Sequence, residues 1–143
     1  MEREGTRELI KKYKLKNNLD LVIFFYCRHT AGDRYQITFE AEIDIEIKEE
    51  FFNRKALNGV DIKDVRTLLG NRTSYKYSKT RNFIADNEKD KIFEEMKQQF
   101  LENNRSYISS PSFPEKLIKR NYVLAQKEEI IRLQRAAFFY DNK

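Results

Sequence analysis

The clearest pattern along the chain is a regular alternation of apolar and polar residues between positions 36 and 47. The apolar positions of this run are Ile37, Phe39, Ala41, Ile43, Ile45 and Ile47. A period of two over about a dozen residues predicts a β-strand that has one face in the core. Residues 20–29 are β-branched and aromatic and predict a second strand, buried on both faces. With the turn-forming run 30–33 between them, the sequence predicts a long antiparallel β-hairpin over 20–48.

Helical patterns lie on both sides of this hairpin. Thr6 can cap a helix to about Lys16, because Leu9, Ile10 and Tyr13 fall on one helical face. Beyond the hairpin, apolar residues at helical spacing and capping residues predict four further helices. The first two are 49–57 and 61–69, the latter after a cap at Asp61. The third begins at Asp86 or Asn87 and carries Phe93 and Phe100, and the fourth is long, from about Pro114 to Phe139.

These elements predict a mixed α+β fold in a single domain. An N-terminal helix and a long antiparallel hairpin, 20–48, come first, and a helical part, 49–140, follows and ends in the longest helix. The 143 residues, 11 Phe and 8 Tyr are enough to bury a core without covalent cross-links, so residues 1–143 are expected to form one domain.

Composition narrows the chemistry. The chain has one Cys and one His, Cys27 and His29, which excludes an internal disulfide framework and leaves a zinc site two ligands short. We therefore expect no metal and no cofactor. The longest apolar run, Leu21 to Cys27, is too short to span a bilayer, and the first five residues lack an apolar stretch. We expect a cytoplasmic protein without a membrane partner.

Charge is unevenly distributed along the chain. Residues 36–52 hold one Lys and six acidic residues, whereas residues 53–82 hold eight Lys and Arg residues and two Asp. A basic segment that follows an acidic one indicates a contact with a polyanion. Simple clustering on a solvated surface is an equally open interpretation.

Part of this basic segment resembles the helix-turn-helix of small DNA-binding regulators. The resemblance covers about 20 residues, from Val60 to Tyr77, in which a helix ends in Leu69-Gly70 and a basic, hydroxyl-rich stretch follows. It implies a second helix, about Thr73 to Arg81, in the major groove. The predicted nucleic-acid-binding residues are Arg54, Lys63, Arg66, Arg72, Tyr75, Lys76, Lys79 and Arg81. The alternative is an ordinary capped helix, 61–69, followed by a basic loop.

A second pattern is typical of metal-dependent nucleases. Glu46-Ile47-Lys48 at a strand end, after Asp20 or Asp33, has the spacing in which two carboxylates hold Mg²⁺ and a lysine activates water. The acidic residues are also simply the polar positions of an alternating strand, and we favour the interpretation that they form a solvated sheet face.

The long C-terminal helix carries apolar clusters around much of its circumference. A small core cannot bury all of them, which predicts contact with a protein partner or a second copy. The predicted interface residues, which lie on one heptad line, are Leu124, Ile131 and Phe138.

The sequence therefore predicts a small, non-enzymatic protein that binds nucleic acid, DNA rather than RNA, through its basic segment. A protein-interaction subunit of a larger assembly without a nucleic-acid role is the first alternative. A small Mg²⁺-dependent nuclease is the second.

Overall fold

The computed structural model of the chain describes residues 5–141. These residues fall into two compact units. The first consists of the described residues up to Asp44 together with Ser74–Pro111, and the second consists of Ile45–Thr73 together with the chain from Ser112 onward. A single domain over 1–143 stays a prediction. Residues 1–4, which contributed to the expectation that no signal peptide is present, lie outside the described range.

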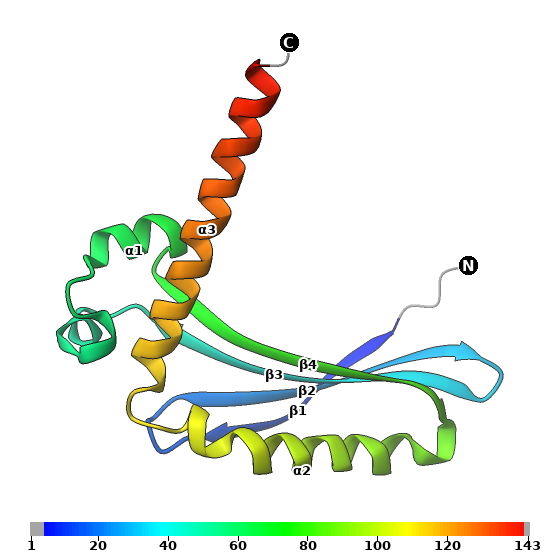
Figure 1. Cartoon of the computed structure of the whole chain (residues 1–143). Coiled ribbons are helices and arrows are strands. Elements are labelled where there is room, and N and C mark those ends of the chain that lie inside the picture. Colours follow the sequence, from blue (N-terminus) through cyan, green and yellow to red (C-terminus); the bar gives the residue numbers. More distant parts are fainter. Residues whose placement is uncertain (1–4, 142–143) are drawn as a thin grey trace. The chain divides into compact units, whose positions relative to one another are not determined.

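A four-stranded antiparallel sheet forms most of the first unit (Figure 1). Its strands, which lie side by side in sequence order, are β1 (Thr6–Lys14), β2 (Asp20–Ala31), β3 (Arg34–Glu46) and β4 (Arg72–Ala85). The predicted hairpin is present as β2 and β3, which place Phe25 opposite Phe39 and Leu21 opposite Ile43. The alternating residues of β3 are buried on one face as expected.

Helix α2 (Lys89–Ile108) follows the short 3₁₀ helix η3 (Asp86–Glu88) and covers one face of the sheet (Figure 1). The predicted apolar face of this helix is buried against the strands. The ring of Phe39 lies 5.8 Å from that of Phe93 and 5.2 Å from that of Phe100, measured between centroids. Aromatic contacts of this kind add to the free energy gained from burying the rings. These contacts hold α2 against one face of the sheet.

The second unit is helical. It contains the 3₁₀ helices η1 (Glu49–Asn53) and η2 (Lys55–Leu57), α1 (Ile62–Leu69) and the long α3 (Phe113–Asp141). Its core includes Leu57, Val65, Leu117 and Ile118. The predicted cap of α1 is confirmed, because the Asp61 carboxylate accepts a hydrogen bond of 2.9 Å from the backbone N–H of Lys63.

The predicted N-terminal helix is wrong, because residues 6–14 form strand β1. Of this strand, Tyr13 is half-buried and the other residues are exposed. Leu9 and Ile10 are solvent-exposed, so their helical spacing marks no buried face. Backbone hydrogen bonds to β2 determine the structure instead, with Thr6 opposite Cys27 and Lys14 opposite Asp20. An edge strand exposed on both faces lacks the alternation that identifies β3.

The predicted helix-turn-helix is also wrong, as is the prediction that the hairpin is followed by helices alone. The first helix of the motif exists as α1, but the second, over Thr73 to Arg81, lies within strand β4. Gly70 ends α1 with φ 78° and ψ −155°, a conformation open essentially only to glycine, and turns the chain into the sheet. The backbone N–H of Ile47 then donates to the carbonyl of Asn71 at 2.9 Å. The basic segment is therefore a strand.

Within residues 5–141, no helix combines the length and the apolar character that crossing a lipid bilayer requires.

Candidate nucleic-acid interface

Strand β4 is an edge strand with an unusual composition. It is the last strand in the sheet order, so one side of its backbone has no neighbouring strand among residues 5–141. Its 14 residues include four basic and no acidic side chains. Lys76, Lys79 and Arg81 are exposed, and none of the three forms an ion pair with another described residue. We call these three residues the basic edge; at about 3.3 Å per residue they extend along roughly 17 Å of strand.

The side chains of the basic edge leave the strand in both directions. Tyr77 faces α2, since its ring centroid lies 4.8 Å from that of Phe100. By the alternation of a strand, Lys79 and Arg81 start on the same face as Tyr77, and Lys76 starts on the opposite face. Lysine and arginine stems are long enough to reach around an open edge. Cationic groups are thus available from both faces of the sheet along one edge.

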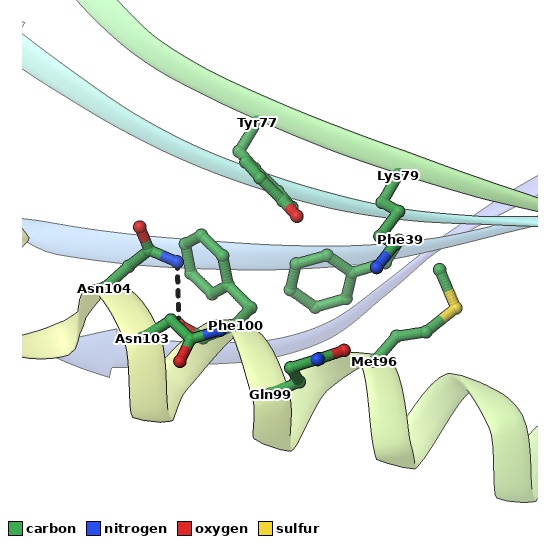
Figure 2. Close-up of a pocket in the computed structure, with 8 residues that line it drawn as sticks. All are labelled: Phe39, Tyr77, Lys79, Met96, Gln99, Phe100, Asn103 and Asn104. Atoms are coloured by element: carbon green, nitrogen blue, oxygen red, sulfur yellow. Dashed lines mark hydrogen bonds between the residues drawn. The ribbon is translucent and has the colours of Figure 1, made fainter.

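Figure 2 shows a small pocket between this strand and α2. Its lining residues are Phe39, Tyr77, Lys79, Met96, Gln99, Phe100, Asn103 and Asn104. The cavity measures about 90 Å³, whereas sites for small molecules usually measure about 300–1,000 Å³. The Asn104 amide donates to the Phe100 carbonyl at 3.0 Å and so contributes to α2 itself. This pocket suits a few waters or part of one side chain, not a cofactor.

Phe83 interrupts β4 directly after the basic edge. It has φ 59°, in the left-handed region, although it is not a glycine. The buried face of the strand changes from odd to even positions here, since Tyr77 and Ile84 both point into the core. One extra residue is therefore inserted, as in a β-bulge. The bulge leaves the Phe83 side chain 76% exposed.

Holding an aromatic residue in this conformation costs about 1–3 kcal/mol, and the exposed Phe83 ring gains little from packing. The guanidinium of Arg34, the first residue of β3, lies 3.5 Å from the Phe83 carbonyl oxygen. An exposed ring therefore projects from the strand that carries the basic edge, and its backbone carbonyl lies near Arg34. Neither Phe83 nor Arg34 was predicted from the sequence. The available signal was an aromatic residue that directly follows a basic, polar run.

Four of the predicted nucleic-acid-binding residues belong to the second unit. Arg54 donates to Glu115 at 3.2 Å, and its guanidinium lies 5.1 Å from the Phe51 ring centroid. Arg66 donates to the Ile47 carbonyl at 2.9 Å. Both side chains therefore have partners that stabilise this unit. The other two, Lys63 in α1 and Arg72 at the start of β4, are exposed.

Of the remaining predicted residues, Tyr75 is half-buried in β4. The three predicted interface residues on α3, Leu124, Ile131 and Phe138, are all exposed.

Two of the four acidic residues of β3 are already paired with a cation from β1. Arg7 of β1 donates to Glu40 at 2.8 Å and to Glu42 at 2.9 Å, so a guanidinium lies between these carboxylates. Asp20 lies near Lys12 and Lys14, at 3.6 and 3.4 Å. In the part of the chain that the structure describes, no three His, Cys, Asp or Glu side chains are grouped to hold a metal ion. Of the pattern that indicated a nuclease, Asp20 and Asp33 lie in salt bridges, whereas Glu46 and Lys48 are exposed. The nuclease alternative stays a prediction.

Cys27 and His29 follow each other on one face of β2. The His29 ring contacts the Gly32 carbonyl through Nε2, and its centroid lies 5.0 Å from that of Tyr35. Cys27 is a free thiol, and burial raises its pKa, while the nearby Lys89 ammonium opposes the rise. A raised pKa makes the thiol a poorer nucleophile at neutral pH.

Comparison of the chain with protein-family models, with curated proteins and with solved structures gives no match.

Proposed function

We propose that the protein binds single-stranded nucleic acid inside the cell, along the basic edge and the neighbouring Phe83. One observation carries the proposal: three cations without ion-pair partners among residues 5–141 lead along an open strand to an exposed aromatic ring in a strained conformation. Proteins that bind single strands combine a cationic track for the phosphates with aromatic rings on which bases stack. The proposed activity is binding, without a catalytic step or a cofactor.

A single strand suits this edge better than a duplex. The expectation of duplex DNA rested on a recognition helix in the major groove, and residues 73–81 are a strand instead. A ring that projects from a sheet edge can stack only on a base whose face is open. Because stacking does not depend on the sugar, the earlier preference for DNA over RNA has no support in this geometry.

The salt dependence of binding tests the role of the basic edge. Replacing Lys76, Lys79 and Arg81 by Ala removes three cations, and the slope of log K against log salt should fall by about 2. The matched control replaces Lys48, Lys55 and Lys116, which are exposed and lie outside β4. This control loses the same net charge and should retain most of the slope. Fluorescence anisotropy of a labelled oligonucleotide over a range of salt concentrations gives the salt slope of the triple variant and of the control.

A variant of Phe83 tests stacking separately from charge. Phe83→Asn removes the ring but keeps a residue that tolerates the left-handed backbone, so the fold should survive. The loss of one base stack predicts about 5- to 150-fold weaker binding, and Phe83→Tyr should bind as the wild type does. The proposal fails if the wild type does not bind at low salt, or if the triple variant retains the wild-type salt slope.

Protein contact through α3 is the second candidate function. The exposure of Leu124, Ile131 and Phe138 favours it, and it does not depend on nucleic-acid binding.

A further inference from the structure

Helix α3 has two halves of different character. Its first half begins at the buried Phe113 and packs Leu117 and Ile118 into the core of the second unit, next to α1, η1 and η2. The second half, 124–140, is mainly exposed. Seven large apolar side chains there are 45–79% exposed: Leu124, Ile130, Ile131, Leu133, Phe138, Phe139 and Tyr140. We call residues 124–140 the exposed helix segment. An apolar surface of this extent indicates an interaction site.

One line of apolar residues runs along the whole helix at intervals of seven. It consists of Leu117, Leu124, Ile131 and Phe138. Seven residues are close to two full turns, so these side chains lie on nearly the same side of the helix. The first of them, Leu117, is buried within the second unit, and the other three are exposed. The side of α3 that faces the core in its first half thus continues as an exposed apolar line in the second.

Charged and polar residues flank this line in a regular way. Glu128 and Arg135 lie on one flank, and Lys127 and Gln134 lie on the other. Glu128 and Arg135 are about 10 Å apart along the axis, too far to pair within one helix. Neither forms an ion pair within residues 5–141, whereas Glu129 pairs with Arg132 at 2.6 Å on another side of the helix.

We infer that the exposed helix segment pairs with the same segment of a second copy of the chain, antiparallel and centred on Ile131. In this arrangement Ile131 meets Ile131 of the second copy, and Leu124 meets Phe138 of the second copy. Equivalent flanks face each other in an antiparallel pair. Glu128 of each copy is then level with residue 134 of the other, within reach of Arg135, and this contact occurs twice by symmetry. The same symmetry places each Lys127 beside a Gln134.

The covered half of α3 determines the direction. In a parallel pair the two copies of Leu117 would face each other, yet each is already covered by elements of its own unit. An antiparallel pair centred on Ile131 confines the contact to residues from about 124 to 138, within the exposed helix segment. The flanking charges, the exposed apolar line and the buried first half of α3 therefore all favour a second copy of the chain as the partner.

Charge reversal tests the arrangement without disturbing the fold, because the changed side chains are exposed. Glu128→Arg places like charges together at both symmetric contacts, and so does Arg135→Glu. The dissociation constant for self-association of each variant should be at least about tenfold higher than that of the wild type. A one-to-one mixture of the two variants should regain the association, because every Arg then meets a Glu. The double variant Glu128→Arg/Arg135→Glu should regain it as well. Sedimentation equilibrium reports the shift of mass between 17.3 kDa and twice that value.

Ile131→Asp should abolish the association and change the unfolding of the monomer little, since Ile131 is 48% exposed and lies outside the buried core of its unit. Gln126→Ala, on the opposite side of the helix, is the control and should associate as the wild type does. A wild type that remains monomeric up to about 1 mM overturns the inference. It is equally overturned by a mixture that associates no better than its components, or by a monomer that binds anionic phospholipid vesicles through this segment.

Discussion

Arg54 was predicted from sequence to contact nucleic acid, and the structure gives it a different task that stability measurements can quantify. Its guanidinium donates to Glu115 at 3.2 Å. The Glu115 side chain is only 8% exposed, whereas that of Arg54 is 42% exposed. Arg54→Ala would leave the Glu115 carboxylate largely shielded from water and without its cation. We expect this variant to destabilise the second unit.

The expected loss lies between two limits. Breaking a fully buried ion pair costs about 3–5 kcal/mol, because an uncompensated charge remains in the interior. A hydrogen bond to a charged group contributes about 1.5–3 kcal/mol. Arg54 is nearly half exposed, so water replaces part of the lost interaction and the lower range applies. We expect a loss of about 2 kcal/mol, which lowers the melting temperature by roughly 8 °C for a chain of this length.

Urea denaturation followed by far-UV circular dichroism measures this loss. Lys55→Ala, at the next position, removes the same charge from a side chain without an ion pair among the described residues, and it should change stability by less than about 0.5 kcal/mol. A double-mutant cycle with Glu115→Gln should give a coupling energy of at least about 1 kcal/mol. If Arg54→Ala proves as neutral as Lys55→Ala, the ion pair has no structural role, and Arg54 is again a candidate for phosphate contact.

Two further predictions concern backbone conformation and thiol chemistry. Gly70→Ala should destabilise the protein by about 1–3 kcal/mol, because only glycine adopts φ 78° with ψ −155° readily. The control is Gly32→Asn, at φ 55° with open space for a Cβ, which should cost less than about 1 kcal/mol. Equal losses of the free energy of unfolding in the two variants would contradict this prediction. The raised pKa of the Cys27 thiol means a smaller thiolate fraction at any pH near 8, so iodoacetamide should react with Cys27 more slowly than with Ser78→Cys in a Cys27→Ser background. Equal rates over the pH range would show that burial does not affect this thiol.

The elements that could be predicted from sequence are those in which the spacing of apolar residues reflects one buried face. Strand β3 alternates because one face is buried, and α2 repeats Phe93, Met96 and Phe100 because one side packs on the sheet. In both cases burial imposes a period that the sequence records.

The two edge strands could not be predicted in this way. Leu9, Ile10 and Tyr13 of β1 happen to have helical spacing, and β4 carries charged or polar residues on both faces. An edge strand is defined by backbone hydrogen bonds to a neighbour distant in sequence, and these leave little trace in side-chain type. The exposed position of Phe83 could not be predicted for the same reason, since a bulge is recognised only when the strand register is known.

The place of β4 in the chain has a consequence for the order of folding. Strands β1, β2 and β3 follow one another through short turns, so their pairing needs only local loop closure. Strand β4 joins β3 only after residues 47–71 have closed a loop of some 25 residues, which is entropically more costly. As the last strand to pair and one of the two edge strands, β4 should also separate before the central strands in native-state fluctuations. Its amide protons should exchange with solvent through local opening, well before those of β2 and β3.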